Sequence, residues 1–422
     1  MTPTEAVERI HQCAWVGQNP GLTRIGQLLE ALGSPQEQLK FVHIAGTNGK
    51  GSTAAMTASI LTQAGLRTGL YTSPHLWRFH ERFQIDGVPM GDEALVEIAG
   101  LVLETAGRLP IRPTEFELMT AMGMVYFARE GCDIVVLEVG LGGRLDSTNI
   151  ISPPEVAVIT NIGLEHTQLL GDTVGKIAGE KAGIIKPGSQ VVLYHQDREV
   201  ETVVEAACHR AGDSLTVTDP HELEVLSTGL EGSEFRYRGE GPYRLALLGE
   251  YQLRNALTAL EIVHALQKRG WAIPAQAVNG GLALARWPGR MELVRRHPDV
   301  MVDGGHNPQC MAALTRSLRE LYPGKKLIFV TGMLADKDFH AMLGDLLPLA
   351  KRVIAVTPDS PRALPGEELA RLAREAGVEA TVCPSISAGT DAALAVAGAE
   401  DGICVCGSLY LVGEVRHHLG LC

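Results

Sequence analysis

The sequence has no segment suited to secretion or to crossing a membrane. The first residues, MTPTEAVERIHQCAW, carry charges where a signal peptide needs an apolar core. No uncharged apolar run approaches the roughly 18 residues that a membrane span requires. We therefore expect a cytoplasmic protein without a membrane partner.

Closely spaced cysteine pairs of the metal-binding or thioredoxin type are missing. The 8 cysteines are Cys13, Cys132, Cys208, Cys310, Cys383, Cys404, Cys406 and Cys422. Their scatter predicts free thiols in a reducing compartment. Cys404 and Cys406 alternate within GICVCGS and are expected on one face of a strand.

Excess positive charge is missing as well. The formal net charge of −12 at pH 7 repels polyanions at long range and argues against nucleic acid as the main partner. An anionic substrate must therefore be held by local cations or by a metal ion.

Low-complexity tracts and repeats of fixed period are also absent, as in an ordinary globular protein. A chain of 422 residues exceeds what one hydrophobic core usually organises, so about two or three domains are expected. Short β-branched runs alternate with helix-length amphipathic segments, the pattern of parallel sheets covered by helices. The expected strands are FVHIAG, RTGLYTS, DIVVLEVG, EVAVITN and QVVLYH, and then DVMVDGG, KLIFVTGM, RVIAVTP, EATVCP and GICVCGS. Two sheets are more plausible than one.

The break between the two groups of strands lies in ARWPGRMELV, where Pro288 and Gly289 interrupt a helical pattern. We predict an α/β fold with a mostly parallel, P-loop-type domain over 1–289 and a smaller Rossmann-like domain over 290–422. The polar segment from Asp213 to Glu240, with alternation in EFRYR, is expected to be a small antiparallel excursion from the first domain.

A glycine-rich turn has the surroundings of a phosphate-binding loop. FVHIA has a buried-strand pattern, GTNGKGS follows it, and STAAMTASILTQAG is helical in character up to Gly65. Backbone N–H groups at such a helix start face phosphates, and Lys50 can reach the outer ones. The spacing departs from the standard pattern, because Ile44 stands where a glycine belongs and Gly51 displaces Ser52. A plain glycine turn of an α/β protein is the alternative.

An acidic residue, Glu138, lies near the end of an apolar strand in DIVVLEVGLGGRLDSTN. An unpaired carboxylate would be costly there, and its hard oxygen atoms suit Mg²⁺. A structural glutamate with a satisfied partner is the alternative.

The shortened loop GTNGKGS resembles the ATP loop of folylpolyglutamate synthase and dihydrofolate synthase, members of the Mur ligase superfamily of ATP-dependent amide-forming enzymes. GLGGRLD, EVAVITNIGLEHTQLLGDTVGKIAGEKAGIIKPG, GEYQLRNALTALEIV and DVMVDGGHNPQCM resemble further segments of this family in consistent order. The resemblance covers nearly the whole chain and implies an ATP-dependent ligase of the bifunctional bacterial type.

The resemblance implies that residues of both predicted domains bind ATP, in a cleft between them. These are Gly46, Thr47, Asn48, Gly49, Lys50, Gly51 and Ser52 of the loop, together with Asn255, Arg290, Asp303 and His306. Asp303 is expected to hold a ribose hydroxyl or an amino group, and His306 to pack near the nucleotide.

The resemblance also implies that Ser73, Glu138 and His166 are magnesium ligands. Two magnesium sites are expected, and a monovalent cation is a further candidate ligand. A Ser-Pro pair after a strand is by itself a turn, and a lone histidine is more often structural. His166, however, follows a strand, at the edge where open α/β sheets place ligands.

Lys181 corresponds to the lysine that this superfamily carbamylates to N6-carboxylysine. Burial lowers the pKa of such a lysine and favours the neutral amine that attacks CO₂. A plain lysine that pairs with phosphate is the alternative. Lys50, His166 and Lys181 are the candidate catalytic residues.

Thr114, Glu115, Phe116 and Glu117 resemble a segment that lines the family's pterin pocket, and Leu145, Asp146 and Ser147 complete it by the same resemblance. An aromatic ring beside hydrogen-bonding groups suits a flat heterocycle. Phe116 as a helix core residue is the alternative. Arg82, in HERFQIDG, is a candidate for holding an acidic substrate, with a surface charge as the alternative.

The implied reaction, in folate biosynthesis and one-carbon metabolism, adds L-glutamate to dihydropteroate, to the γ-carboxylate of reduced folates, or to both. Bifunctional members of the family carry out both reactions, and others chiefly the second. The substrate carboxylate attacks the γ-phosphate of ATP, and the amino group of glutamate then displaces phosphate from the acyl phosphate. The protein positions these groups and neutralises charge. A monomer is expected.

Two other functions stay open at this point. One is a Mur-type ligase that acts on a cell-wall precursor. The other is a P-loop nucleotide-binding regulator or transporter ATPase, which would turn over ATP without glutamate or pteroate.

Overall fold

A computed structural model describes residues 1–13 and 21–421 of the protein. The chain forms two compact units. Unit 1 comprises Met1–Glu224, Arg236–Tyr243 and Arg254–Ala285, and unit 2 comprises Val225–Phe235, Arg244–Leu253 and Arg286–Cys422. The predicted α/β fold, with a large mostly parallel N-terminal domain and a smaller C-terminal one, is confirmed. The chain passes more than once between the units from residue 224 to residue 286.

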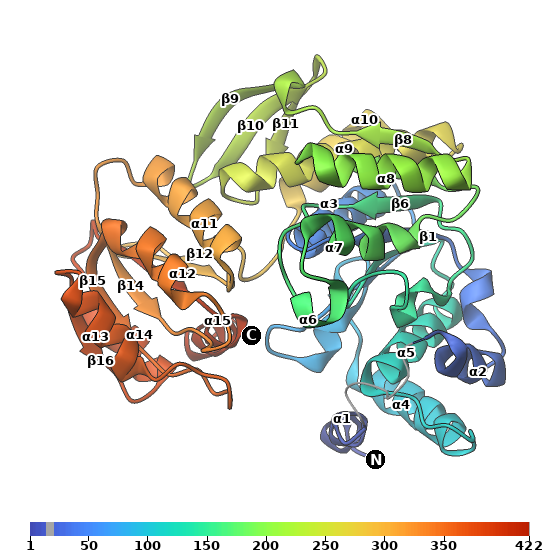
Figure 1. Ribbon diagram of the computed structural model, residues 1–422, viewed down its shortest axis with the longest axis horizontal. Coiled ribbons are helices and arrows are strands. Elements are labelled where there is room, and N and C mark those ends of the chain that lie inside the picture. The colour runs from blue at the N-terminus through green and yellow to red at the C-terminus, as the bar shows by residue number, and fades with distance from the viewer. Residues whose placement is uncertain (14–20, 422) are drawn as a thin grey trace. The chain divides into compact units, whose positions relative to one another are not determined.

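Unit 1 is built on an eight-stranded sheet of order β4-β3-β2-β5-β1-β6-β7-β8. Figure 1 labels β1, β6 and β8 of this sheet. The strands are β1 (Phe41–Ala45), β2 (Thr68–Tyr71), β3 (Phe83–Ile85), β4 (Val88–Pro89), β5 (Ile134–Glu138), β6 (Val156–Ile159), β7 (Gln190–Leu193) and β8 (Ser214–Val217). From β2 to β8 the neighbouring strands are parallel, and β3 and β4 add an antiparallel edge. The carboxyl ends of the parallel strands therefore meet at one edge, where such sheets bind ligands.

Helices cover both faces of this sheet. On one face, α3 (Lys50–Gln63) contacts β1, β2 and β5 and packs on α10 (Ala275–Leu284). The two helices approach so closely that a Cβ on Gly281 would lie 2.4 Å from Ile60 Cα. The opposite face packs on α1 (Pro3–His11), α2 (Thr23–Ala31), α4 (Asp92–Gly107) and α5 (Glu115–Arg129), and on α7 (Val174–Lys181) and α8 (Arg198–Ala211).

The segment from Asp213 to Glu240, predicted as a small antiparallel excursion from the first domain, is divided between two sheets in the structure. Ser214–Val217 is β8, which pairs in parallel with β7 at the edge of the large sheet. A separate three-stranded sheet of order β11-β10-β9 contains β9 (Leu223–Gly229), β10 (Gly232–Tyr237) and β11 (Glu240–Leu245). Part of it, Val225–Phe235, belongs to unit 2. Burial alternates along β10, as EFRYR predicts, but alternation identifies a buried face and not the partner strand.

Unit 2 contains a six-stranded sheet of order β12-β13-β17-β14-β15-β16, parallel except for the β12–β13 pair. Its strands are β12 (Glu292–Arg295), β13 (Asp299–Asp303), β14 (Leu327–Thr331), β15 (Ala350–Ala355), β16 (Glu379–Val382) and β17 (Gly402–Cys406). Its helices are α11 (Pro308–Leu321), α12 (Phe339–Leu346), α13 (Gly366–Glu375), α14 (Ile386–Val396) and α15 (Leu409–His418). All ten strands predicted from sequence are present.

The remaining helices are short, apart from α9 (Glu250–Lys268). They are α6 (Thr167–Leu170) and the 3₁₀ turns η1 (Pro35–Gln38), η2 (Phe79–Arg82), η3 (Ser147–Ile150), η4 (Ala182–Ile184), η5 (Pro220–Glu222) and η6 (Leu347–Leu349).

The described cysteines are free thiols, and Cys404 and Cys406 are buried in β17 as predicted. Cys422 lies outside the described residues. Among residues 1–13 and 21–421, no helix is both long and apolar enough to cross a bilayer.

Candidate active site

The turn GTNGKGS joins β1 to α3 at the carboxyl edge of the large sheet. A Cβ on Gly46 would lie 1.8 Å from Thr160 Oγ1, at the end of β6, so a side chain does not fit there. Gly49 has φ 86°, in the left-handed region that favours glycine, and a Cβ on it would lie 2.6 Å from Asn255 Oδ1. Two close approaches thus explain two glycines of the shortened loop, and the second places Asn255 beside that loop.

The loop is fastened to the segment that follows β6. The backbone amides of Thr47 and Asn48 both donate to Asn161 O, at 2.8 and 3.1 Å. Thr47 Oγ1 donates to Gly163 O at 3.2 Å and lies 3.1 Å from Gly163 N. The amides of Gly49, Lys50 and Gly51 begin α3 instead, where N–H groups have no acceptor within the helix and the dipole attracts anions. A phosphate is therefore expected at the start of α3 and not on the amides of Thr47 and Asn48, which already donate to Asn161 O.

Two predicted lysines converge on one carbonyl oxygen. Lys50 Nζ donates to Gly46 O at 2.9 Å and to Thr47 O at 3.2 Å. Lys181, at the end of α7 and only 2% exposed, donates to the same Gly46 O at 2.8 Å and to Glu165 Oε1 at 2.8 Å. Burial and the nearby Lys50 ammonium lower the pKa of Lys181 to about 8. Lys181 therefore lies against the phosphate loop, with an acid that the sequence prediction missed.

Two of the three predicted magnesium ligands lie together. Glu138, 5% exposed at the end of β5, accepts a hydrogen bond at Oε2 from Ser73 N at 3.0 Å. His166 is exposed and has φ 45°, immediately before α6. In the part of the chain that the structure describes, no three His, Cys, Asp or Glu residues gather as a metal site. The hard oxygen atoms of Ser73 and Glu138 fit Mg²⁺, which commonly completes its shell with water and phosphate oxygens.

Two predicted pterin residues, Thr114 and Glu117, are engaged in starting α5. Thr114 N donates to Glu117 Oε2 at 2.7 Å, and Glu117 N donates to Thr114 Oγ1 at 3.3 Å. This is a capping box, and Arg24 Nε adds a 3.0 Å bond to the same Glu117 oxygen. Glu115 Oε1 contacts His11 Nδ1 at 2.8 Å.

Phe116 is partly buried against the core, and its ring occupies the space beside Gly140. A Cβ on Gly140 would lie 2.2 Å from Phe116 Cζ. Phe116 thus lies against the GLGGRLD loop.

Asp146 and Ser147 organise the turn after the GLGGRLD stretch. Buried Asp146 accepts from Leu141 N at 2.8 Å and from Thr148 N at 3.0 Å, and burial raises the pKa of its carboxyl group. Ser147 Oγ lies 2.6 Å from Thr120 Oγ1. Leu145, which directly precedes Asp146, is 48% exposed.

Arg82 is buried, which excludes the alternative of a surface charge. It is 7% exposed, its Nε donates to His75 Nδ1 at 2.9 Å, and its Cζ lies 5.8 Å from the centre of the Phe79 ring. Burial and the Arg82 charge lower the pKa of His75 to about 3, so this ring is neutral and can accept. Among the described residues, no carboxylate lies within ion-pair distance of Arg82. A buried cation without an acidic partner can receive one from a ligand.

Unit 2 carries the other predicted nucleotide residues. Asp303, buried at the end of β13, accepts from Gly305 N at 2.7 Å, Met291 N at 2.9 Å and Tyr251 Oη at 3.3 Å. Arg290 also lies close, since a Cβ on Gly304 would be 2.4 Å from its Nη1. His306 Nδ1 lies 2.9 Å from Gly304 O.

Sequence reasoning missed Thr160, Asn161, Glu165 and Tyr251. The first three follow β6, and the strand-end rule that singled out His166 applies to them equally.

Two family models match the chain. The Mur ligase middle domain matches residues 44–263, and the Mur ligase glutamate ligase domain matches residues 289–409. Folylpolyglutamate synthase of Lacticaseibacillus casei is 37% identical, over 99% of each chain. Dihydrofolate synthase/folylpolyglutamate synthase of Bacillus subtilis is 35% identical, over 97% of each.

Solved structures agree. Mycobacterium tuberculosis folylpolyglutamate synthase complexed with ADP superimposes with a TM-score of 0.91 at 33% identity, over 99% of this chain and 98% of that one. E. coli FolC in complex with DHPP and ADP gives a TM-score of 0.88 at 30% identity, over 100% and 98%. The chain therefore belongs to the Mur ligase family and, within it, to the folylpolyglutamate and dihydrofolate synthases, which are ATP-dependent glutamate ligases.

Proposed function

We propose that this ligase joins L-glutamate to the carboxylate of dihydropteroate and to the γ-carboxylate of reduced folates. The observation that carries the proposal is the meeting of three features at the carboxyl edge of one sheet. These are the phosphate loop with Lys50 and Lys181 on Gly46 O, the Ser73–Glu138 pair, and the segment after β2 that contains buried Arg82. Relatives named for both activities, and solved relatives with ADP or DHPP, support it.

In this proposal, the phosphates of ATP lie at the start of α3. The amides of Gly49, Lys50 and Gly51 and the side chains of Lys50 and Ser52 neutralise and orient them. Asn255 supports the loop from the side of Gly49. Arg290, Asp303 and His306 of unit 2 hold the nucleoside part.

Ser73, Glu138 and His166 would hold magnesium, which supplies neutralisation of phosphate charge when it is bound. Lys181 is the residue for carbamylation. Its Nζ lone pair attacks the carbon of CO₂, an N–C bond forms, one proton leaves, and a carbamate anion results. A pKa of about 8 leaves a useful neutral fraction near that pH. The alternative is an ammonium group that keeps its bond to Glu165.

The acidic and aromatic parts of the substrates are assigned to unit 1. Phe116 provides a ring for the flat pterin, with Glu115 beside it, while Thr114, Glu117, Leu145, Asp146 and Ser147 complete the pocket. The Arg82 guanidinium receives a substrate carboxylate.

The chemistry needs no covalent nucleophile from the protein. A carboxylate oxygen of the substrate attacks the γ-phosphorus, and ADP leaves. The amino group of glutamate then attacks the acyl carbon, phosphate leaves, and the amine loses a proton. The side chains act by placing the reactants and offsetting their charge.

A phosphate-release assay with purified protein, ATP, Mg²⁺ and L-glutamate tests the proposal. Dihydropteroate, tetrahydrofolate and a muropeptide precursor serve as separate acceptors, and mass spectrometry identifies the product. We expect release that requires glutamate and a pteridine acceptor, with a glutamyl residue added to the pteridine. Release that is indifferent to every pteridine, or that follows the muropeptide precursor, would overturn the proposal.

We further propose that the protein acts in the cytoplasm as a monomer. The free thiols among its described residues are what a reducing compartment maintains. Size-exclusion chromatography with light scattering tests the monomer, and a mass of two or more chains would contradict it.

A further inference from the structure

One side-chain amide, that of Gln196, binds three backbone groups beside the phosphate loop. Gln196 follows β7, at the same carboxyl edge of the sheet as the loop. Its Oε1 accepts from Ile162 N at 2.8 Å. Its Nε2 donates to Thr160 O at 3.2 Å and to Tyr194 O at 3.1 Å. The amide therefore ties the end of β7 to the segment that follows β6.

That segment is the support on which the phosphate loop rests. Thr160 Oγ1 fills the space that a side chain on Gly46 would need, and Asn161 O accepts the amides of Thr47 and Asn48. Gln196 binds the residues on either side of Asn161. A shift of this segment would move the acceptor of two loop amides.

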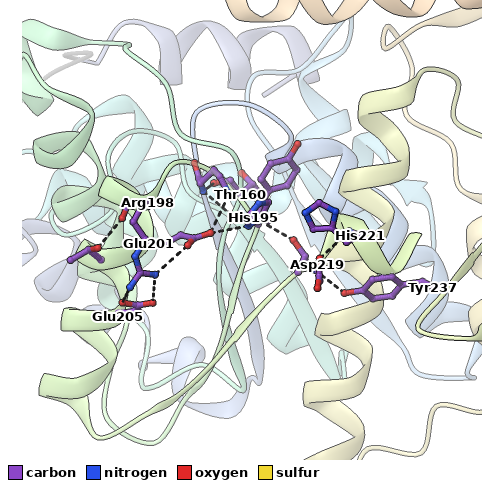
Figure 2. A network of polar contacts seen from close by, with 12 residues as sticks. Thr160, His195, Arg198, Glu201, Glu205, Asp219, His221 and Tyr237 are labelled. Atoms are coloured by element: carbon purple, nitrogen blue, oxygen red, sulfur yellow. Dashed lines mark hydrogen bonds and ion pairs between the residues drawn. The ribbon is translucent and has the colours of Figure 1, made fainter. Parts of the chain in front are cut away.

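The backbone of Gln196 joins a larger polar network, in which Figure 2 labels Thr160, His195, Arg198 and Glu201. Its backbone N–H donates to Glu201 Oε1 at 3.5 Å, and the same carboxylate contacts His195 Nδ1 at 2.9 Å and Arg198 Nη1 at 3.4 Å. His195 N donates to Thr218 Oγ1 at 2.8 Å. The network joins α8 to residues that follow β7 and β8, and all of these residues belong to unit 1.

We propose that Gln196 is a positioning residue for the phosphate loop, acting on ATP binding through Thr160, Asn161 and Ile162. The amide fits this role because it offers a donor and an acceptor at once, which the two carbonyls and the N–H require. The inference rests on the proposed function, since it takes GTNGKGS to be the loop that binds the phosphates of ATP.

A matched residue lies on the same strand. Gln190, at the opposite end of β7, accepts from Ser214 Oγ at 2.8 Å and thereby joins β7 to β8. It has the same side chain in the same sheet, but it lies at the amino end of β7, away from the phosphate loop.

The experiment compares Gln196→Ala, Gln196→Glu and Gln190→Ala with the unsubstituted protein. It measures kcat, KM for ATP, KM for glutamate, and the rise in melting temperature with ADP. We expect Gln196→Ala to raise KM for ATP about tenfold, to leave KM for glutamate within about twofold, and to reduce the shift with ADP. Gln190→Ala should leave KM for ATP within about twofold.

Gln196→Glu keeps the volume and the acceptor for Ile162 N but sets an oxygen against the carbonyls of Thr160 and Tyr194. It should also raise KM for ATP, and it serves as the test if the alanine variant fails to fold. The inference is wrong if a folded Gln196 variant keeps the KM for ATP of the unsubstituted protein, whether or not it melts at a lower temperature. An unsubstituted protein that does not use ATP with glutamate would instead overturn the proposed function.

Discussion

Replacing Arg82 by methionine should lower kcat/KM for an acidic substrate while the free energy of unfolding changes little. A charge-assisted bond between a guanidinium and a carboxylate contributes about 1.5–3 kcal/mol, so its loss lowers kcat/KM for the acidic substrate that it holds roughly tenfold to 150-fold. Stability should respond differently. The cation is 7% exposed and forms no ion pair with a described residue, so its removal relieves a desolvation cost that the more distant Glu81, Glu115 and Glu138 offset only in part.

The same change loses the bond to His75 and the contact with the Phe79 ring. Each of these contributes about 1 kcal/mol, so the free energy of unfolding should change by no more than about 1 kcal/mol in either direction. Initial rates with glutamate and with the pteridine acceptor varied separately give the two KM values. Urea unfolding gives the stability.

Arg78→Met is the control, because Arg78 lies four residues earlier, is largely exposed and pairs with Asp92. It should leave both kcat/KM values within about twofold. The reasoning fails if Arg82→Met leaves kcat/KM for both acidic substrates unchanged. It also fails if activity falls only in proportion to a large loss of stability, since a structural cation would behave that way.

Three further outcomes are expected. Lys50→Ala should lower kcat at least about a hundredfold while the thermal melt by circular dichroism stays unchanged, because the hydrogen bonds of Nζ to described residues go to two loop carbonyls; a lost transition would indicate a structural role. Gly140→Ala should raise KM for the pteridine about tenfold and leave KM for ATP unchanged, since its Cβ would lie 2.2 Å from Phe116 Cζ; equal changes in both would contradict this. Removal of CO₂ should lower activity, and added bicarbonate should restore it more fully above pH 8 than below. The pKa of Lys181 is about 8, so the neutral fraction of this amine grows as the pH rises through that value. Activity that does not respond to bicarbonate would refute carbamylation.

The strands could be predicted because their buried residues form short β-branched runs, as in FVHIA and DIVVLE. The helix start at Lys50 and the stop near Gly65 follow from local backbone preferences of glycine. The partner with which each strand pairs could not be predicted in the same way. The sequence SLTV carries no mark that assigns it to β7, since any exposed strand edge offers the same backbone groups.

The candidate site divides along the same line. Lys50, Glu138 and Lys181 could be found from sequence because each stands in a motif or at a strand end. Arg82 was a candidate without a known environment, because burial and the absence of an acidic partner depend on side chains from distant segments.

Local pattern and residue type were therefore enough to predict ten of the strands, the family, and Lys50, Glu138 and Lys181 as candidate charged residues of the site. Contacts between distant segments came from the fold alone. Lys50 and Lys181 both donate to Gly46 O, the amides of Thr47 and Asn48 donate to Asn161 O, and the Gln196 side chain bonds to Thr160 O and Ile162 N. These contacts join residues up to 135 positions apart. Parallel strands align their carboxyl ends whatever the length of chain between them, and no local pattern in the sequence records which side chains then meet.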